Sequence, residues 1–256
     1  MPTTISASVV TYNNADQITR MLASLEAYVD RSKLVLYLVD NASTDNTLAI
    51  VRDSFPWVKV IACEKNVGFG AGNNTVLSLI ESRYHVCINP DIEFTQDSIS
   101  ALVAYLDANP DVAIATPRIL NPDGSEQKLP KLRPRLNYLL ARRFEKHSKR
   151  ARQLCRAYTR ADEPFSQATD IEVATGCFFV IRTATFKALR GFDQRFFLYF
   201  EDADLSLRAG SLGRVVFFPH TEVVHYYERA ATKSLRAFAI QIASMLKFFK
   251  KSRRKP

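Results

Sequence analysis

Three carboxylates stand directly behind an aromatic run late in the chain. Residues 196–200 read Phe-Phe-Leu-Tyr-Phe, and Glu201, Asp202 and Asp204 follow. Burying a carboxylate is costly unless something compensates its charge, so acids beside an apolar segment suggest a bound cation or proton transfer. Helix capping explains them equally well, because acids in a first helical turn complement the helix dipole and Asp204 precedes Arg208 by one turn. The rest of the sequence has to decide between chemistry and structure.

Polar residues end each of four β-rich runs in the first half of the chain. These runs cover residues 5–11, 34–39, 58–62 and 84–88. Helical stretches are expected between and after them at residues 15–28, 45–54 (after a Ser43/Thr44 cap), 71–82 and 97–108. This alternation is typical of a mostly parallel sheet with helices on its faces. Ligands bind such sheets outside the carboxyl ends of the strands, so we expect the polar tips to meet at one crevice.

Two acids at these strand tips lack a full structural explanation. Helix capping accounts for residues 43–45 but not for Asp40, so ligand binding is favoured there. Asp91 follows the fourth run, where a carboxylate can hold Mg²⁺ or Mn²⁺ against a diphosphate, whereas an Asx-type turn would explain Asn89 better than Asp91. His225 ends a late β-rich run, and by itself such a histidine is more often a core residue than a ligand.

The glycine-rich residues 66–74 read Asn-Val-Gly-Phe-Gly-Ala-Gly-Asn-Asn. They do not form a dinucleotide-binding fingerprint, because Asn73 occupies the place of its third glycine and the segment follows the third strand instead of the first. Two interpretations remain open. The loop either brings backbone amides close to a phosphate, or it is a tight turn between a strand and a helix.

The second half of the chain is less regular. The turn at residues 121–124 predicts a hairpin, and residues 129–168 combine prolines with basic residues, which predicts a partly helical, mobile insertion. Gly176 marks a place in a strand where another group approaches closely. Further strands are expected at residues 112–116, 171–181, 215–218 and 222–226, and a final helix at residues 233–250.

Composition excludes several classes of protein. The chain is 47% hydrophobic and 24% charged, which is typical of a soluble globular domain. It has neither a membrane-spanning apolar run nor a secretory signal, so we expect a cytoplasmic protein. The four cysteines lack the paired spacing of zinc or thiol-exchange sites and are expected to be reduced thiols.

The net charge of +9 is concentrated in two tracts. Residues 131–160 contain eleven Lys or Arg and one acid, and nine basic residues with no acid follow Glu228. The remainder is acidic, which argues against a nucleic-acid-binding domain. Residues 235–251 mix apolar and basic side chains, and this pattern fits either a helix on an anionic membrane surface or a helix packed on the domain with a solvated basic tail.

Six motifs taken together resemble the family 2 inverting glycosyltransferases of GT-A fold, and among these the bacterial rhamnosyltransferases. The motifs, in the expected order between about residue 5 and residue 228, are Val-Val-Thr-Tyr-Asn at 9–13, Val-Asp-Asn-Ala-Ser-Thr-Asp at 39–45, Asn-Val-Gly-Phe at 66–69, Asn-Pro-Asp at 89–91, Gly-Phe-Asp at 191–193 and Phe-Glu-Asp-Ala-Asp at 200–204. The resemblance implies an α/β fold with a Rossmann-like, mostly parallel sheet. Its parts would be a nucleotide-binding half (1–117), the insertion (129–168), a catalytic and acceptor half (169–228) and a C-terminal helix and tail (229–256).

The resemblance also implies roles for individual residues. The family's metal ligands match Asp91 and His225, although the first Asp of its Asp-x-Asp motif is Asn89 here, a weaker ligand. Asp202 matches the catalytic base, and Glu201 beside it would position groups or bind the acceptor. The nucleotide-sugar donor would be bound by Thr11, Asn13, Asp40, Asn66, Gly68 and Asn89.

The implied reaction moves a sugar from a nucleotide diphosphate to a saccharide, with Mg²⁺ or Mn²⁺ as cofactor. The resemblance favours rhamnose from dTDP-rhamnose, then UDP-sugars, with a lipid-linked acceptor in cell-surface polysaccharide assembly at the inner face of the cytoplasmic membrane. Two other interpretations remain. One is a nucleotide-sugar hydrolase or nucleotidyltransferase on a related scaffold. The other is a non-enzymatic polyanion-binding protein, which leaves the acidic and strand-tip residues unexplained.

Overall fold

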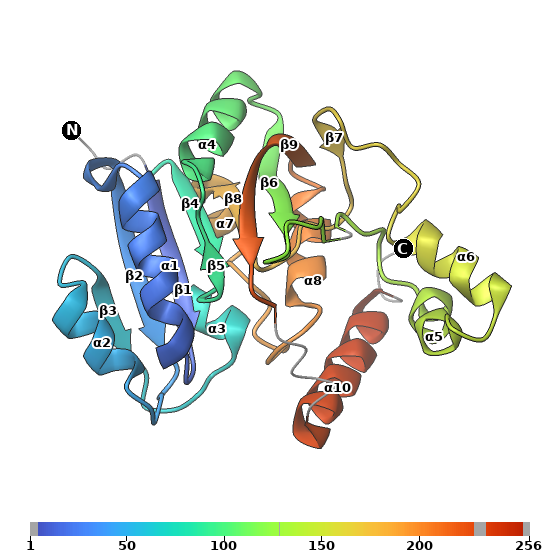
Figure 1. Cartoon of the computed structure of the whole chain (residues 1–256), viewed down its shortest axis with the longest axis horizontal. Coiled ribbons are helices and arrows are strands. Elements are labelled where there is room, and N and C mark those ends of the chain that lie inside the picture. The colour runs from blue at the N-terminus through green and yellow to red at the C-terminus, as the bar shows by residue number, and fades with distance from the viewer. Residues whose placement is uncertain (1–4, 128, 228–233, 253–256) are drawn as a thin grey trace.

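The structure is a computed structural model that describes residues 5–127, 129–227 and 234–252 (Figure 1). Its centre is one sheet with the strand order β3-β2-β1-β4-β8-β6-β9-β5, and β7 pairs with β9 beside this path. The strands are β1 Ile5–Thr11, β2 Leu34–Asp40, β3 Lys59–Ala62, β4 Tyr84–Ile88, β5 Ile92–Glu93, β6 Val112–Leu120, β7 Thr169–Asp170, β8 Phe178–Arg182 and β9 Arg214–His225. The helices are α1 Ala15–Tyr28, α2 Thr47–Ser54, α3 Phe69–Asn74, α4 Ser98–Ala108, α5 Leu136–Phe144, α6 Lys149–Tyr158, α7 Thr183–Ala188, α8 Glu201–Ala209 and α10 Leu235–Ser252.

The first half of the sheet is parallel, as predicted. β1 pairs in parallel with β2 and β4, and β2 pairs in parallel with β3. Every residue of β1 is buried, as expected for a parallel strand that is covered on both faces. α1 covers β1 and β2 in Figure 1, and its buried residues follow helical spacing: Ile18, Met21, Leu22 and Leu25.

The second half of the sheet is mixed. β8 runs antiparallel between β4 and β6, and β9 runs parallel to β6 but antiparallel to the short β5. The β5–β9 pairing sets Ile92 opposite His225, which places the end of a late strand beside the tip of β4. The hairpin expected at residues 121–124 is present, with the Gly124 N–H donating to the Asn121 carbonyl at 2.9 Å. The expected α/β architecture is confirmed.

Two predicted helix boundaries are wrong. α2 begins at Thr47 after Asn46, and the Ser43/Thr44 cap is absent because the Ser43 hydroxyl donates to Asp40 instead. α3 ends at Asn74, well short of residue 82. The sequence of α3, Phe-Gly-Ala-Gly-Asn-Asn, is rich in weak helix formers, which is the physical reason for its shortness.

The predicted strand at residues 171–181 is also only partly formed. Only its end is in the sheet, as part of β8, because β7 ends at Asp170 and the residues between β7 and β8 form no regular strand. Two backbone N–H groups of this stretch donate to side chains of α8: Ala174 to the Ser206 hydroxyl and Gly176 to Asp202, each at 3.1 Å. These bonds replace strand pairing. The two late strands are a single strand, β9, with an irregularity between Phe218 and Glu222.

The insertion at residues 129–168 contains α5 and α6 packed against each other, which confirms that it is partly helical. Its mobility stays a prediction. The Leu132 N–H donates to the Tyr158 carbonyl, so the segment before α5 is bonded to the end of α6. The Arg133 N–H donates to Glu172 at 2.8 Å, which bonds the insertion to the segment after β7.

The cysteines are free thiols, and no described helix is long and apolar enough to cross a membrane. Part of the predicted C-terminal unit, residues 229–233 and 253–256, lies outside the described residues.

Gly191 carries a packing constraint that can be tested. Gly191 and Gly124 both have positive φ angles (67° and 79°), but a Cβ at Gly191 would lie 2.1 Å from Asn74 Oδ1, whereas a Cβ at Gly124 meets nothing within 4 Å. Gly124→Ala should therefore cost about 1–2 kcal/mol from backbone strain alone. Gly191→Ala should cost at least about twice as much, measured by urea unfolding. Equal losses in the two variants would contradict the packing argument.

Candidate active site

The tips of β1 and β2 are joined through Asp40. Thr11 pairs with Asp40 in the sheet, and its hydroxyl donates to the carboxylate at 2.9 Å. Ser43 donates to the same carboxylate from its N–H at 2.8 Å and its hydroxyl at 2.5 Å. Thr11 and Asp40 are both fully buried. These bonds compensate the buried charge and fix the turn after β2, and the predicted contact of Asp40 with a nucleotide stays a prediction.

Asn13 is exposed at the same edge. Its backbone has a positive φ of 57°, which asparagine tolerates better than most residues. Its side-chain oxygen accepts the Thr44 N–H at 2.8 Å, and its own N–H donates to the Ser43 hydroxyl at 2.9 Å. The two strand tips therefore form one connected polar surface.

Asn41 extends this surface to the glycine-rich loop. Its amide nitrogen donates to the Gly68 carbonyl at 3.2 Å, and its oxygen accepts the Val67 N–H at 3.4 Å. Within the loop, Asn66 accepts the Gly68 N–H at 2.9 Å. The sequence pattern placed Asn41 beside Asp40 but did not reveal that it ties the loop to β2.

The glycine-rich loop packs directly against the segment before the three acids. The Phe69 N–H donates to the Phe197 carbonyl at 2.9 Å, and a Cβ at Gly68 would lie 2.2 Å from that oxygen. A Cβ at Gly70 would lie 2.9 Å from Phe192 Cβ. At least two of the glycines therefore serve this close approach, and the phosphate interpretation stays a prediction.

The backbone that leads into α8 is strained. Tyr199 and Phe200 are consecutive bulky residues with φ of 71° and 69°, an arrangement that costs of order 1–3 kcal/mol each and that clusters at functional sites. α10 supports this stretch. The Ser244 hydroxyl donates to the Leu198 carbonyl at 2.8 Å, and the buried Phe248 ring lies 5.4 Å from that of Phe200. The packing interpretation of the C-terminal stretch is confirmed for this side of α10.

The three acids of α8 are not equivalent. Asp204 is buried between Arg208 Nε at 2.8 Å and Lys251 Nζ at 2.5 Å, so it is structural, as its spacing from Arg208 predicted. Glu201 is also buried, and burial together with the Asp202 charge raises the pKa of Glu201 well above its usual value. The Glu201 Oε2 atom has no hydrogen-bond partner among the described residues.

Asp202 is the partly exposed acid of the three. One carboxylate oxygen accepts the Gly176 N–H at 3.1 Å, and the other accepts the Ala203 N–H at 2.7 Å. A Cβ at Gly176 would lie only 3.1 Å from Asp202 Cβ, so this glycine permits the close approach that the sequence predicted for it. The carboxylate is held in one orientation with part of its surface open to a reactant.

A second group of polar atoms gathers where β4 ends. Asp91 Oδ1 lies 3.2 Å from His225 Nε2, because the Tyr226 N–H donates to the Asp91 carbonyl and holds the two segments together. Asn89 Oδ1 is buried without a hydrogen bond among the described residues, whereas Asp91 Oδ1 and His225 Nε2 are buried with their mutual ion pair as their contact. A polar atom without a partner is costly to bury unless a ligand satisfies it.

The spacing of Asp91 Oδ1 and His225 Nε2 fits a divalent cation. Two donors that bind Mg²⁺ or Mn²⁺ at about 2.1 Å and at right angles stand about 3.0 Å apart, close to the distance between Asp91 and His225. No cluster of three or more His, Cys, Asp or Glu side chains suited to a metal occurs in the described part of the chain, and the third polar atom here is the amide oxygen of Asn89. Burial alone would lower the pKa of His225, but Cys177 and Asp91 raise it to about 10, so a cation has to displace the Nε2 proton in order to bind this nitrogen.

Gln127 fixes the orientation of His225 and was missed by sequence reasoning. Its amide nitrogen donates to the His225 carbonyl at 3.1 Å, and its oxygen accepts from the ring Nδ1 at 3.2 Å. The Nδ1 atom therefore carries a proton, which leaves Nε2 facing Asp91. No local motif signals this role, because Gln127 reaches His225 only through the hairpin after β6.

Residues 176 and 177 connect the two groups. The Gly176 N–H binds Asp202, while the Cys177 carbonyl accepts the Asn89 N–H at 2.8 Å. Consecutive Cα atoms are about 3.8 Å apart, so the carboxylate of α8 and the donors after β4 lie on either side of a short stretch of backbone. Asp202 and the polar residues after β4 are thus both held next to residues 176–177, and their roles as base and cation ligands stay predictions.

Residues 6–190 match the family described as glycosyl transferase family 2. The chain belongs to this family. This glycosyltransferase is 30% identical over 234 residues to an N-acetylglucosaminyl-diphospho-decaprenol L-rhamnosyltransferase of Mycobacterium tuberculosis, with 85% of this chain and 74% of the relative covered. It is 24% identical over 234 residues to the rhamnosyltransferase WbbL of Escherichia coli, with 85% and 81% covered. The resemblance inferred from the motifs is confirmed.

Solved glycosyltransferase structures share the fold. A structure of S. aureus TarS aligns with a TM-score of 0.63 and 19% identity, covering 86% of this chain, which spans only 60% of that chain. A second neighbour is the mannosyltransferase PcManGT from Pyrobaculum calidifontis, solved with GDP-Man and Mn²⁺. It aligns with a TM-score of 0.67 and 19% identity, and the alignment covers 99% of this chain and 65% of the PcManGT chain. The expected GT-A-type fold is confirmed.

The buried Glu201 predicts a pH dependence of stability. Because its pKa is raised in the folded state, the unfolded chain loses the proton first as pH rises above about 4.5, and folding stability falls. Glu201→Gln removes this loss. The variant should match the wild type near pH 4 and become progressively more stable than it toward pH 8 in urea unfolding. Glu163→Gln, which removes an exposed carboxylate paired with Arg160, is the control. A constant difference between Glu201→Gln and the wild type across pH would contradict the assignment.

Proposed function

We propose that this glycosyltransferase moves rhamnose from dTDP-rhamnose to a hydroxyl of a lipid-linked saccharide, with inversion at the anomeric carbon. The observation that carries the proposal is the placement of Asp202 and of the Asn89, Asp91 and His225 donors on two sides of residues 176–177. The names of both curated relatives support the sugar, and the mycobacterial name supports a lipid diphosphate-linked acceptor. Such an acceptor places the reaction at the inner face of the cytoplasmic membrane, in cell-surface polysaccharide assembly.

Asn89, Asp91 and His225 would hold the divalent cation. Mn²⁺ is favoured over Ca²⁺ by a donor set of two oxygens and one imidazole nitrogen, and Mg²⁺ is the alternative. When bound, the cation supplies compensation for the negative charge that develops on the departing nucleotide diphosphate. Gln127 would hold the His225 ring so that its Nε2 atom faces Asp91.

Asp202 acts as the general base. It takes the proton of the acceptor hydroxyl while the hydroxyl oxygen forms a bond to the anomeric carbon and the bond from that carbon to the diphosphate oxygen breaks. The electron pair of the broken bond leaves with the diphosphate. The N–H groups of Gly176 and Ala203 hold the base in one orientation, and Glu201 lies beside it as a positioning residue.

The edge formed by the tips of β1 and β2 and the glycine-rich loop would bind the nucleotide sugar. Asn13 is exposed there, and the turn that carries it is fixed by the bonds around Asp40. The donor-binding set consists of Thr11, Asn13, Asp40, Asn66, Gly68 and Asn89. A UDP-sugar donor is the second candidate, supported by a TarS structure solved with UDP-GlcNAc.

Replacing the base gives the direct test of the reaction. Asp202→Asn keeps the size of the side chain and an oxygen for the Gly176 N–H, so the fold and donor affinity should persist while kcat falls by about 10²-fold to 10⁴-fold. The matched control is Asp204→Asn, which breaks a buried ion pair and should lose stability but retain most of kcat at a temperature where it is folded. Rapid turnover by Asp202→Asn would overturn the role of the base. Release of free sugar at the same rate without an acceptor would identify a hydrolase instead.

Thermal denaturation tests the cation and the donor separately. Mn²⁺ at about a hundredfold excess over its Kd should stabilise the wild type by about 2.7 kcal/mol. Asp91→Asn and His225→Ala should lose most of that shift, whereas Asn89→Asp should strengthen it. Further stabilisation by dTDP-rhamnose beyond that given by UDP-sugars would identify the donor. An unchanged Tm of the wild type in Mn²⁺ would contradict the cation site.

A further inference from the structure

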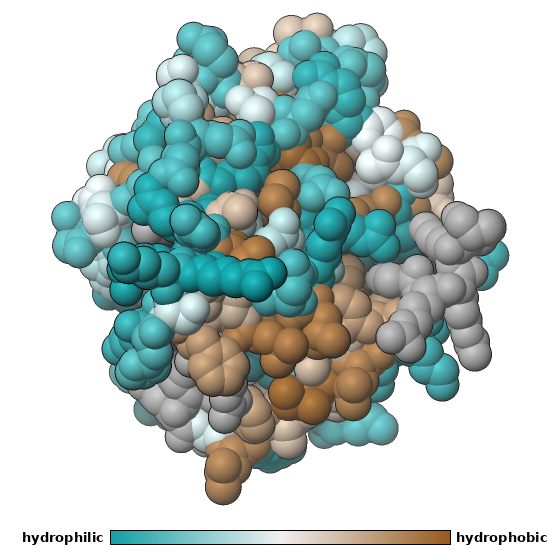
Figure 2. Space-filling view, turned by 90° about the vertical axis from the view of Figure 1, so that its right-hand side faces the viewer, coloured by the Kyte–Doolittle hydropathy of each residue, from teal (hydrophilic) through white to brown (hydrophobic). Residues whose placement is uncertain are grey.

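An apolar surface lies on the side of the molecule that carries α5, α6 and α10. Figure 2 shows this side, with hydrophobic residues gathered in its lower half and hydrophilic residues around them. Large apolar side chains that are at least 40% exposed occur on two helices there: Leu136, Leu140 and Phe144 on α5, and Leu235, Phe238 and Leu246 on α10. Exposure of this extent on neighbouring helices is typical of a contact surface and not of a solvated helix.

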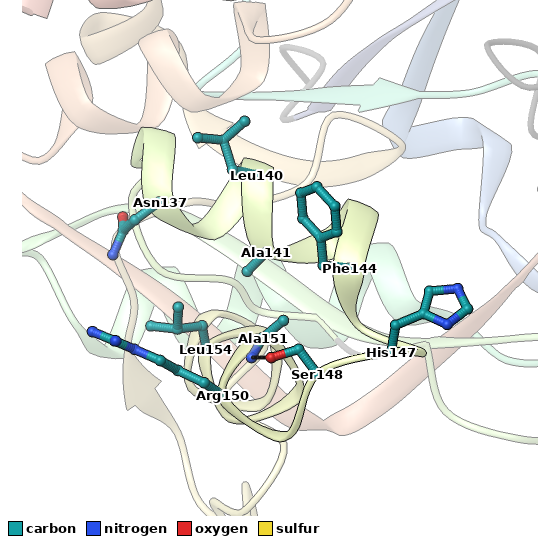
Figure 3. Close-up of a pocket in the computed structure, with 9 residues that line it drawn as sticks. All are labelled: Asn137, Leu140, Ala141, Phe144, His147, Ser148, Arg150, Ala151 and Leu154. Carbon is teal, nitrogen blue, oxygen red and sulfur yellow. Dashed lines mark hydrogen bonds between the residues drawn. The ribbon is translucent and has the colours of Figure 1, made fainter.

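The residues on α5 form one stripe. Leu136, Leu140 and Phe144 follow one another at intervals of four residues, which places them on the same side of the helix. Figure 3 shows Leu140 and Phe144 projecting from α5 and Arg150 extending from α6, around a groove of about 420 Å³ between the two helices. The groove lies away from the strand tips that would bind the donor.

α10 has two apolar sides with different neighbours. Ser244 and Phe248 face the protein and are almost fully buried. By helical periodicity Leu235 and Leu246 lie on the opposite side and Phe238 lies between the two sides; all three are exposed, Leu235 by 89% and Leu246 by 62%. Internal packing therefore explains only one side of this helix.

The charge around these apolar residues has one sign. Exposed basic residues border the apolar stripe on α5 and α6, whereas Glu145 is the single acid among residues 131–160. α10 contains no acid, and its basic residues are Arg236, Lys247, Lys250 and Lys251, of which Lys251 is neutralised by Asp193 and Asp204. Apolar side chains ringed by cations match an anionic lipid bilayer, which offers hydrocarbon below a negatively charged surface.

We propose that the outward sides of α5 and α10 together form a docking surface for an anionic lipid bilayer. The surface is defined by Leu136, Leu140, Phe144, Leu235, Phe238 and Leu246 and the basic residues beside them. The helix that the sequence suggested as the membrane contact thus acts with the α5–α6 insertion. Docking does not rest on the proposed reaction, because it needs neither donor nor acceptor.

Both parts of the docking surface, α10 and the α5–α6 insertion, belong to segments that interact with the region around Asp202. The inner side of α10 holds the strained segment that leads to Asp202. On the insertion, burial raises the pKa of Tyr158 at the end of α6 to about 12, with a smaller contribution from the Asp202 charge that Arg142 opposes. A bilayer under α5 and α10 therefore brings the headgroup region near the site where a lipid-linked acceptor would react.

Vesicle sedimentation of the full-length protein tests the docking surface. The wild type should sediment with phosphatidylcholine vesicles that contain phosphatidylglycerol and only weakly with phosphatidylcholine alone. Leu140→Glu and Leu246→Glu should each weaken sedimentation by at least about tenfold, because a charge replaces an inserted apolar side chain. The matched control is Leu212→Glu, which makes the same change in net charge. Leu212 is 55% exposed and lies in the turn before β9. This variant should sediment as the wild type does.

Three outcomes would overturn the proposal. One is a wild type that stays in solution with both kinds of vesicle, and another is a loss of sedimentation in Leu212→Glu equal to that in the two test variants. The third is a wild type that is dimeric in light scattering and becomes monomeric in Leu140→Glu without vesicle binding, which would make the surface a contact between two copies. Unchanged Tm values without lipid show that the variants are folded. Transfer to a water-soluble acceptor should stay at the wild-type rate in both variants, so a failure of docking and a failure of the reaction are distinguished.

Discussion

The close approach of the glycine-rich loop to Phe197 is the contact on which the rest of the site depends. It joins the parallel half of the sheet to the segment that carries the three acids, and it exists because Gly68 has no side chain to strike the Phe197 carbonyl. The pair of hydrogen bonds between Asn74 and Phe192, each at 2.8 Å, fixes the same two regions a few residues further along. This junction holds the segment that leads to Asp202 against the parallel half of the sheet.

Strain and charge are concentrated on one side of that junction. Tyr199 and Phe200 hold unfavourable backbone angles, and Asp204 is buried. Both costs are offset by α10, which packs Phe248 against the strained segment and places Lys251 between Asp193 and Asp204. Packing alone would not suffice, because a buried carboxylate needs a specific partner. The C-terminal helix is therefore part of the catalytic half and not an appendage to it.

Helices and strands whose apolar residues recur at regular spacing could be predicted from the sequence. The strands that lead to Asp40 and Asp91 are short apolar runs followed by polar residues, and they form as predicted. Two of the failures come from a hydrogen bond that competes with the predicted element, one to a distant residue and one to a residue three positions away. The backbone at Gly176 leaves its predicted strand to bind Asp202, and the Ser43 hydroxyl binds Asp40 instead of capping a helix. The role of Gln127 was equally invisible, because only the folded hairpin brings it to His225. Local pattern thus predicts the scaffold and the identity of most candidate groups, while the orientation of each group is set by contacts between distant parts of the chain.

The dependence of the catalytic half on α10 has a consequence for biosynthesis. Asp202 and the strained residues before it leave the ribosome earlier than the helix that supports them, because the chain is made from its N-terminus. Until α10 emerges, the carboxylate of Asp204 has no Lys251 and Phe200 has no Phe248 to pack against. The sheet can form during translation, but the segment around Asp202 gains its full support only afterwards. A nascent chain therefore carries the strained residues without their packing partner until α10 has been made.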